Sequence, residues 1–542
     1  MVRIPDSVAD IARAHQEILE SGGLRDGHGA FYTPLGVVDR LVDIAIADRI
    51  ARVDSVDHTI RVLDPSCGTG NFLIVVALRI ARRLQDLGVP TDDSIDHVVR
   101  NCVHGVDVDP RAVDLCRQQL SALTAGRVPP DELVATIRVA DWLLEPIRAA
   151  GFDVVIGNPP FLDQQARATA STRERHDKVA GVLGARRARI SRLTNPAAVF
   201  LLRSLDSIVD DGVVAMVQPV SFLTARGTGG VRQEIADTPA AVDVWITRDL
   251  VFDAAVHVCA VVVDRARPAA VNVHLDGSGI VPHPVDELRG PTWAFAAADL
   301  HGVPSVVEPR SGCLGDVCDV TADFRDQYYG LVGHVHDETD PDEDSMRLVT
   351  TGLIDPFTCS WGAHGTRFAR SAYSHPVVRP ADLPAPMREW AETRAVPKVL
   401  VATQTRVLEA VADSVGGLLP SVPVLTIVPN DSGDLWRVLA MVMSPVTSVI
   451  AARRHLGAGL SSDAIKMAAS DIAALPLPVD DDSWNHGALL AERLQAGESR
   501  DLATFGLVMC RAHGLGSRDA ARIMEWWIPR VSRSRPARAS GR

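Results

Sequence analysis

The first half of this sequence repeats one unit: a short apolar run that closes on polar or glycine residues and leads into a helical pattern. The unit occurs at residues 60–84 and 102–120, and the apolar runs at 135–144 and 152–161 close in the same way. Near-continuous apolar strands that alternate with helices are typical of a parallel sheet with helices on both faces. Residues 1–270 are therefore predicted to form a doubly wound α/β domain.

The chain has 542 residues, too many for one ordinary hydrophobic core. Residues 271–480 hold many prolines, glycines and short β-like runs without a repeated unit, which predicts a second domain of mixed α+β type. Residues 481–542 are predicted to be a C-terminal helical segment with a basic tail.

Composition narrows the class of protein. No apolar run is long enough to span a bilayer, and charges run through the N-terminal segment, which favours a cytoplasmic protein without a membrane partner. The eight cysteines are scattered without a CxxC pair, so neither a metal site nor a disulfide framework is expected. The net charge of −13 argues against a general nucleic-acid coat but allows a local basic cleft.

The glycine turn "DPSCGTGNF" lies between a predicted strand and a predicted helix. Gly68 and Gly70 allow the backbone to approach a ligand and to direct N–H groups toward it. Such a turn alone fits a dinucleotide, a nucleotide or no ligand. Asp64, at the end of the strand, suits a ligand amine or ammonium group better than a phosphate, so the ligand is expected to be cationic.

Acidic residues also close the next two strands. Asp107 or Asp109 in "GVDVDP" can accept hydrogen bonds from ribose hydroxyls. Asp141 in "VADW" can accept from an adenine amino group, and Trp142 can pack on the base. Taken singly, each acid is more often a helix cap or a turn residue. Because ligands bind at the carboxyl ends of such strands, the ordered set predicts one site for a nucleoside-like cofactor.

The fourth strand ends in "GNPPF", which joins an amide, two prolines and an aromatic ring. Pro159 and Pro160 lack N–H groups and have a fixed φ, so they end the strand and stiffen the turn after it. A simple turn that contains a phenylalanine is the alternative. The place of this turn after three acid-closed strands favours a catalytic role.

A basic stretch comes directly after this turn. Residues 163–192 carry eight basic and three acidic side chains. A solvated loop or helix face explains such a run about equally well. Its place beside the predicted site favours contact with nucleic-acid phosphates through Arg186 and Arg187.

The order of "YTP", "DPSCGTGNF", "GVDVDP", "ADWLL" and "GNPPF" resembles the DNA adenine-N6 methyltransferases of the gamma motif order. The resemblance covers residues 28 to about 265 and implies a class I methyltransferase domain with S-adenosylmethionine as methyl donor and double-stranded DNA as substrate. It also implies a target recognition domain, whose opening and closing segments residues 312–324 and 461–478 resemble. It allows a separate restriction endonuclease as partner and leaves the oligomeric state open. Since the chain begins about 30 residues before the cofactor domain, no N-terminal nuclease is expected.

Position by position, the resemblance implies these site residues. The cofactor would contact Thr33 and Pro34 at its methionine end, Asp64, Ser66, Cys67, Gly68 and Gly70 in the glycine turn, Asp107 at its ribose, and Asp141, Trp142 and Phe200 at its adenine. The catalytic motif would be Asn158, Pro159, Pro160 and Phe161. Phe161 stands where tyrosine is usual, although phenylalanine is common in subunits of multisubunit restriction systems. Phe252 resembles a second aromatic that stacks on a flipped base, with a core phenylalanine as the alternative.

The residue chemistry agrees with adenine methylation. The oxygens of Asn158 and Pro159 can accept both N–H groups of an exocyclic amine, and the Phe161 ring can stabilise the positive charge that develops on the base. A base within a duplex must flip out to reach such a pocket.

Two alternatives use the same fold. "NPPF" also occurs in methyltransferases of ribosomal RNA guanine, and "NPPY" in glutamine methyltransferases of release factors; both are shorter and usually lack the "YTP" segment and a large C-terminal domain. An inactive DNA-binding subunit is the other alternative, and the intact acids and "NPPF" argue against it.

Overall fold

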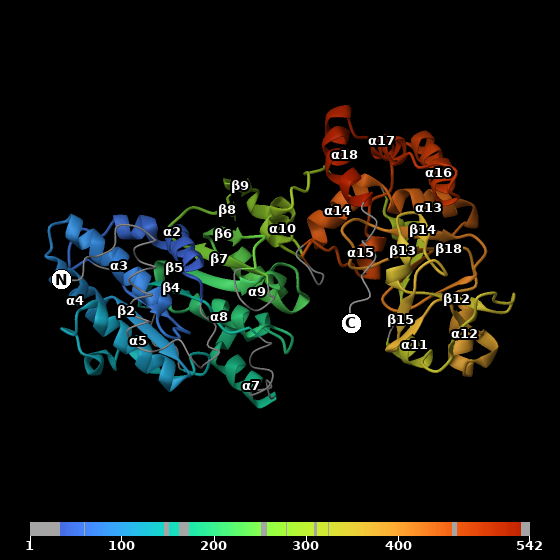
Figure 1. Cartoon of the computed structure of the whole chain (residues 1–542). Coiled ribbons are helices and arrows are strands. Elements are labelled where there is room, and N and C mark those ends of the chain that lie inside the picture. The colour runs from blue at the N-terminus through green and yellow to red at the C-terminus, as the bar shows by residue number, and fades with distance from the viewer. Residues whose placement is uncertain are drawn as a thin grey trace. The chain divides into compact units, whose positions relative to one another are not determined.

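The computed structural model of this chain describes residues 33–532, except residue 59, 146–150, 162–172, 251–256, residue 278, 308–311, residue 324 and 458–462. The chain divides into two compact units, Met1–Ala296 and Ala297–Arg542 (Figure 1). The first unit extends past the predicted boundary at residue 270, because two further strands, which begin at Ala270 and Gly279, continue its sheet.

The first unit is built on a nine-stranded sheet with the order β3-β2-β1-β4-β5-β7-β6-β8-β9. Its strands are β1 (Val62–Asp64), β2 (Val103–Asp107), β3 (Ile137–Val139), β4 (Phe152–Gly157), β5 (Ile208–Pro219), β6 (Ala241–Ile246), β7 (Val258–Asp264), β8 (Ala270–Leu275) and β9 (Gly279–His283).

Strand direction is mixed rather than parallel throughout. Strands β1 to β5 pair in parallel, as predicted, but β7 runs antiparallel to both β5 and β6. Residues 247–257, between β6 and β7, are too few for the crossover that a parallel neighbour needs. An apolar run indicates that a strand is buried, and it does not indicate the direction of that strand.

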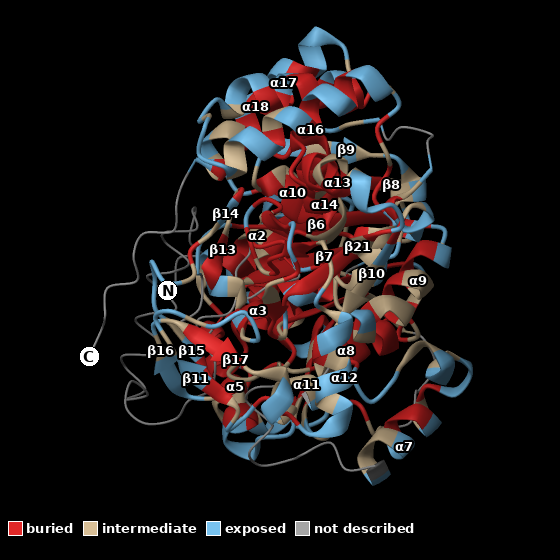
Figure 2. Ribbon diagram, turned by 90° about the vertical axis from the view of Figure 1, so that its right-hand side faces the viewer, coloured by how far each residue is buried: buried red, intermediate tan, exposed pale blue. Residues whose placement is uncertain are grey.

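Helices cover this sheet. The helices of the first unit are α2 (Leu35–Ala51), α3 (Asn71–Asp86), α4 (Thr91–Asn101), α5 (Pro110–Leu123), α7 (Arg173–Val182), α8 (Pro196–Ser204) and α9 (Gly229–Asp237), and α10 (Phe295–Leu300) spans the division between the units. α3 packs against both α2 and α4, and α8 packs against β5 and α9. Figure 2 shows the central strands buried and the outer helical faces exposed. Each fully buried Val, Leu or Ile side chain stabilises such a core by about 1.5–3 kcal/mol.

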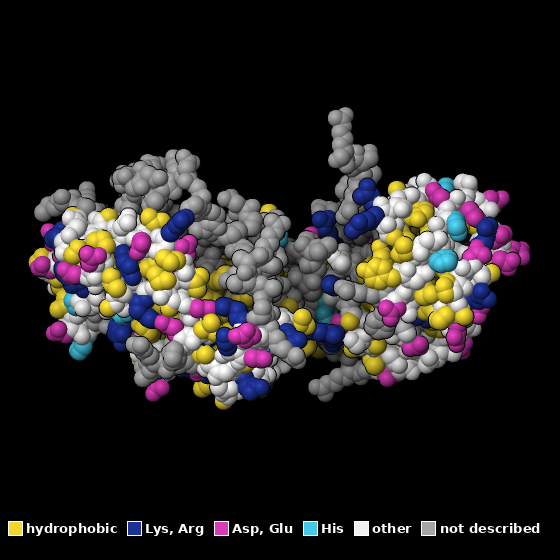
Figure 3. Space-filling view, turned by 90° about the horizontal axis from the view of Figure 1, so that it is seen from below, with side chains coloured by type: hydrophobic (Ala, Val, Ile, Leu, Met, Phe, Trp, Pro, Cys, Tyr) yellow, Lys and Arg dark blue, Asp and Glu magenta, His cyan; other side chains and the backbone are white. Residues whose placement is uncertain are grey.

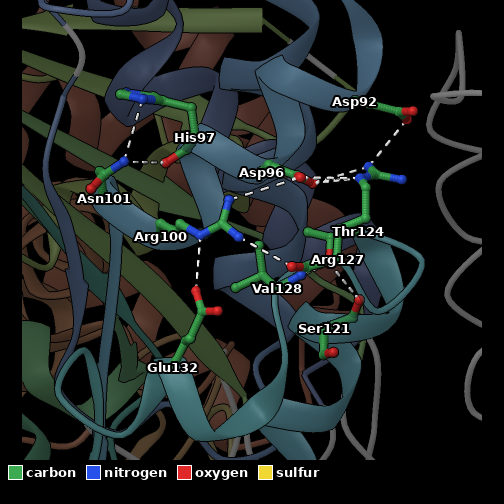
Figure 4. A network of polar contacts seen from close by, with 10 residues as sticks. All are labelled: Asp92, Asp96, His97, Arg100, Asn101, Ser121, Thr124, Arg127, Val128 and Glu132. Carbon is green, nitrogen blue, oxygen red and sulfur yellow. Dashed lines mark hydrogen bonds and ion pairs between the residues drawn. The ribbon is translucent and has the colours of Figure 1, made fainter.

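A surface network of ion pairs joins α4 to the segment after α5 (Figure 4). Arg127 Nε donates to both carboxylate oxygens of Asp96, at 3.1 and 3.0 Å, and its Nη2 lies 3.1 Å from an oxygen of Asp92. Arg100 Nε donates to Glu132 at 3.0 Å. These side chains are partly exposed, so each pair contributes little to stability, and the network mainly fixes the approach to β3.

The second unit contains two four-stranded sheets, β10-β21-β18-β19 and β11-β17-β12-β20, together with two hairpins. The strands are β10 (Cys318–Ala322), β11 (Val335–Asp337), β12 (Met346–Val349), β13 (Ile354–Asp355), β14 (Thr358–Cys359), β15 (Thr366–Phe368), β16 (Ser371–Tyr373), β17 (Pro376–Val378), β18 (Lys398–Val401), β19 (Ala410–Asp413), β20 (Leu418–Pro420) and β21 (Leu425–Pro429). The predicted mixed α+β class is confirmed.

The helices of this unit are α11 (Arg325–Gly330), α12 (Ala385–Thr393), α13 (Leu435–Val442), α14 (Pro445–His455), α15 (Ala469–Ala473), α16 (Asp481–Gln495), α17 (Leu502–Ala512) and α18 (Ser517–Val531). The last three are the predicted C-terminal helices. They are not a separate segment, because α16 packs on α13 while α17 and α18 pack on α14, and Phe505 of α17 and Trp527 of α18 are buried. Among the described residues no single helix is long and apolar enough to cross a membrane; Ser432–Val442 and Pro445–His455 meet that criterion only together, across a 62° bend.

The two segments predicted to open and close the second domain pair with each other. Leu314 N donates to Leu475 O at 2.9 Å, and Leu477 N donates to Gly312 O at 2.9 Å. An antiparallel bridge joins Cys313 to Pro476 between them. The opening and closing segments of the predicted second domain therefore lie side by side.

Candidate active site

The predicted site residues gather at the carboxyl edge of four adjacent strands. Asp64 is the last residue of β1, Asp107 the last of β2 and Gly157 the last of β4, and Asp141 follows β3 by two positions. These strands are parallel neighbours in the order β3-β2-β1-β4. The chain reverses its direction of sheet growth between β1 and β4, which is where such folds open a ligand crevice.

The glycine turn is tied to the end of β2. Gly68 N donates to Asp107 Oδ2 at 2.9 Å, and Cys67 N donates to Val106 O at 3.0 Å. Gly70 has a φ of 97°, and a Cβ added there would lie 2.7 Å from Cys116 Sγ. A Cβ added at Gly68 would instead meet no atom within 4 Å. The turn is therefore closely packed on its inner side and open above Gly68.

Asp64 is a buried carboxyl group, with 1% of the residue exposed. Its pKa is raised to about 8, mainly by burial; the hydrogen bond from Ser66 N, at 3.0 Å, lowers the pKa in part, and the nearby charge of Asp107 adds to the rise. Across the crevice, a Cβ at Gly157 would lie 2.5 Å from Asp64 Oδ1. Without a cation nearby, the acid is neutral at pH 7 and packs directly against the end of β4.

Asn158 is held by one side of its amide. Its Nδ2 donates to Thr33 Oγ1 at 3.0 Å, and Asn71 Nδ2 reaches the Thr33 carbonyl at 3.3 Å. Asn158 Oδ1 is buried and has no hydrogen-bond donor among the described residues. A buried acceptor left without a partner is costly unless a ligand supplies the donor.

The rest of the motif supports this amide. Pro159 is buried, and its carbonyl accepts no hydrogen bond within the part of the chain that the structure describes. Pro160 is half-buried, and the ring of Phe161, also half-buried, packs against the edge of the main core. Pro34, just before α2, accepts from Val37 N at 2.9 Å.

Trp142 and Arg203 form a buried stack behind Asp141. The guanidinium carbon of Arg203 lies 4.3 Å from the centre of the Trp142 ring, and Arg203 Nη2 donates to the Glu145 carbonyl at 2.5 Å. Burial lowers the pKa of Arg203 to about 10, so it stays charged at neutral pH. Phe200 lies buried one helical turn before Arg203 in α8.

Asp141 has a partner that the sequence did not predict. Arg175 Nη1, from α7, lies 2.6 Å from Asp141 Oδ2, and Leu143 N donates to Asp141 Oδ1 at 3.2 Å. One carboxylate oxygen of the predicted adenine acceptor is therefore held by the helix that comes after the "GNPPF" segment.

The two predicted phosphate contacts differ in environment. Arg186 donates to Glu234 at 2.8 Å and to Asp206, and its side chain is only 19% exposed, so it belongs to an internal network rather than to a free cationic surface. Arg187, its neighbour, is exposed. On the face shown in Figure 3, basic and acidic side chains are interspersed, consistent with such pairing. Phe252 lies outside the described residues.

Three residues were missed as parts of this site: Asn71, Arg175 and Arg203. Asn71 is the first residue of α3 and directly follows the glycine turn, so its side-chain amide is close to any ligand that this turn binds. Arg203 had a visible signal, since a lone charge in the apolar run "AVFLLRSL" must be paired or stacked when buried. Arg175 had none, because nothing in a basic run tells which residue will reach an acid 34 positions away.

The buried polar atoms fit a polar, nucleoside-like cofactor. Ser66 Oγ, Asn71 Oδ1 and Trp142 Nε1 are buried and have no hydrogen-bond partner among the described residues. They belong to the glycine turn, to the first residue of α3 and to the segment just after β3. A ligand with several hydrogen-bonding groups would satisfy them.

Comparison with known proteins gives a family match for most of the first unit. Residues 21–275 match the family described as N-6 DNA Methylase. This similarity covers just under half of the chain. The matched range begins before the "YTP" segment and ends with β8, so it takes in every predicted site residue of the first unit.

Two curated proteins are similar in sequence to part of this chain. The chain is 30% identical over 146 residues to Type II methyltransferase M.BstVI of Geobacillus stearothermophilus, which covers 26% of this chain and 25% of the relative. It is 28% identical over 162 residues to Type II methyltransferase M.PaeR7I of Pseudomonas aeruginosa, covering 29% and 27%. The matched part thus spans about a quarter of the length of each relative.

A solved structure matches nearly all of the chain. The Type IIL restriction-modification enzyme MmeI, solved in complex with DNA, is similar with a TM-score of 0.57 over 98% of this chain and 80% of its own, at 11% identity. The fold is therefore a class I methyltransferase domain followed by a mixed α+β domain, as the sequence predicts.

Proposed function

We propose that this chain transfers a methyl group from S-adenosylmethionine to the exocyclic N6 of a flipped adenine in double-stranded DNA. The observation that carries the proposal is Asn158 Oδ1, a buried acceptor at the end of β4 that is without a donor among the described residues, while the other side of the amide is bound to Thr33. A substrate N–H group is the partner that this oxygen lacks.

The amine needs activation because its lone pair is delocalised into the adenine ring. Asn158 Oδ1 and the Pro159 carbonyl accept its two N–H groups, which draws the nitrogen toward tetrahedral geometry and localises the lone pair. Pro159 and Pro160 keep these acceptors rigid, and preorganised acceptors need no rearrangement during the reaction. After transfer the nitrogen releases one proton to solvent.

Phe161 receives the face of the base. Its ring is half-buried and already packed on the core, so it offers a fixed stacking surface. Positive charge develops on the base during transfer, and a ring in contact with it contributes roughly 1–2 kcal/mol by cation–π attraction. The base reaches this surface only outside the duplex.

The donor side of the crevice would hold the cofactor, which supplies an electrophilic methyl group when bound. The residues that would hold it are those of the glycine turn, with Asp64 facing its ammonium group, Asp107 its ribose and Trp142 its base. The neutral state of the free Asp64 carboxyl means that binding a cation would release a proton from it.

Exposed arginines of the first unit would contact the DNA backbone. They are Arg187, Arg192 and Arg226. Thr194 Oγ1 donates to Gly227 O at 2.6 Å, and this hydrogen bond joins the segment that carries Arg192 to the segment that carries Arg226. These three arginines are exposed and have no acidic partner among the described residues. Such contacts add affinity without sequence preference.

The biological role that we propose is restriction-modification in the cytoplasm, with or without a separate nuclease. Its support is that both curated relatives are Type II methyltransferases.

Single-molecule sequencing of genomic DNA tests the function, in a methylation-deficient host that expresses either the wild-type chain or Asn158→Ala. The wild type should produce N6-methyladenine in one sequence context, and the variant none. The purified variant should bind the cofactor within about threefold of the wild-type affinity, since the lost group acts on the amine. Modification of another base, or of none by a wild-type chain that binds the cofactor, would contradict the proposal.

A further inference from the structure

One hairpin of the second unit has an unusual turn. β15 and β16 pair as Thr366 with Tyr373 and Phe368 with Ser371, which leaves Ala369 and Arg370 as a two-residue loop. Both loop residues have positive φ, 47° and 71°. A loop of this kind usually contains asparagine, aspartate or glycine, because a Cβ is disfavoured in the left-handed region.

The surrounding structure holds this turn in place. Ala369 N donates to the hydroxyl of Tyr328 at 3.2 Å, and the Tyr328 ring packs on Phe368 with 4.8 Å between ring centres. Thr366 and Thr350 share a hydrogen bond of 2.6 Å at the other end of β15. Disfavoured backbone that is fixed by its neighbours is concentrated at functional sites.

The hairpin has one buried and one exposed face. Phe368, which is 3% exposed, and Tyr373 belong to the hydrophobic cluster beneath it. Arg367 lies opposite Ala372 on the other face, and Arg370 is at the tip; both arginines are exposed. The small Ala372 side chain leaves the guanidinium of Arg367 unobstructed.

Neither arginine has a polar partner among the described residues. Within the part of the chain that the structure describes, Arg367 and Arg370 make no ion pair or side-chain hydrogen bond. By contrast, Arg379 pairs with Glu338 at 3.0 Å and Arg394 with Asp323 at 2.8 Å. On α11, the ring of Tyr329 lies 5.5 Å from that of Tyr328 and is 65% exposed. Two free arginines on a fixed hairpin are a surface suited to nucleic acid.

We propose that the β15–β16 hairpin enters the major groove and that Arg370 and Arg367 read guanine within the recognition sequence. A two-stranded ribbon fits the major groove, and arginine donates a pair of hydrogen bonds to O6 and N7 of guanine. The inference rests on the proposed function and adds to it the base that the recognition sequence must contain. Figure 1 shows β15 next to α11, which carries both tyrosines.

The test uses the full chain in the same methylation-deficient host. Arg370→Ala and Arg367→Ala are compared with Arg500→Ala, which removes another exposed arginine of this unit. The wild type should methylate a context that contains guanine. At least one hairpin variant should accept other bases at one guanine position, with discrimination reduced roughly 10- to 100-fold, and Arg500→Ala should keep the wild-type context.

A second measurement covers the case in which a hairpin variant loses all methylation. The purified wild-type chain is given duplexes in which 7-deazaguanine, which lacks the N7 acceptor, replaces each guanine of the context in turn. Methylation should fall at least tenfold at one position or more. Undiminished methylation of every such duplex, or hairpin variants that both keep the wild-type context, would overturn this inference alone. A wild-type chain that leaves no methylated adenine would overturn the proposed function and the inference together.

Discussion

Asn158 Nδ2 donates to Thr33 Oγ1 at 3.0 Å, across 125 positions of sequence. This bond fixes which side of the amide faces the protein and leaves Oδ1 as an acceptor. Thr33 precedes α2, and Asn158 comes directly after β4, so the entry to the first described helix positions the proposed catalytic group.

Loss of this bond should slow the reaction more than it weakens binding. Thr33→Val keeps the shape of the side chain but removes the hydroxyl, and we expect kcat to fall about tenfold, which corresponds to roughly 1.4 kcal/mol. Steady-state kinetics and cofactor titration are the measurements. Thr33→Ser should restore most of the rate, because it restores the hydroxyl. A loss confined to cofactor affinity would place Thr33 at the cofactor instead.

The raised pKa of Asp64 makes stability depend on pH. In the free protein the folded state keeps the proton up to about pH 8, whereas the unfolded chain loses it near pH 4, so the free energy of unfolding falls as pH rises through this interval. From pH 6 to pH 8 this one group should lower it by about 2 kcal/mol. Urea unfolding of Asp64→Asn should show a smaller decline, and the exposed Asp93→Asn should match the wild type. Equal slopes for all three proteins would show that Asp64 is already ionised.

The ion pair between Arg175 and Asp141 should compete with the cofactor. If Asp141 accepts from the adenine amino group, Arg175 must release it, and a partly exposed pair of this kind is worth up to about 1 kcal/mol. Arg175→Met should therefore tighten cofactor binding about two- to fivefold in a calorimetric titration. Lys178→Met, an exposed change on the same helix, is the control. Weaker binding by Arg175→Met would mean that the arginine supports the site.

Adjacent arginines should respond differently to charge reversal. Arg186→Glu sets a carboxylate against Asp206 and Glu234, so we expect the free energy of unfolding to fall by about 1–3 kcal/mol. Arg187→Glu should leave the free energy of unfolding unchanged and weaken DNA binding. The slope of the logarithm of the binding constant against the logarithm of the salt concentration should become shallower by about one. Unfolding and binding at several salt concentrations separate the two effects. An unchanged salt slope for Arg187→Glu would remove it from the DNA surface.

The sequence predicted the parts of the fold that depend on local patterns. Apolar runs located β1, β2, β3 and β4, and the parallel order of these strands brought Asp64, Asp107 and Asn158 to one edge. The antiparallel β7 was not predicted, because direction depends on which strands pair. The internal role of Arg186 was missed for a related reason, since its partner Glu234 lies on a helix 48 positions later. Side-chain partners from distant elements are decided by packing, which the local pattern does not contain.

Strands β1 and β4 pair directly, with Val62 opposite Val154, and Gly157 touches Asp64 where they end. In the proposed reaction the residues that hold the methyl donor follow the first strand and those that hold the acceptor follow the second, so the pairing of these two strands keeps donor and acceptor groups together. The hairpin proposed to read DNA belongs to the other unit, so its sequence can change without altering this pairing.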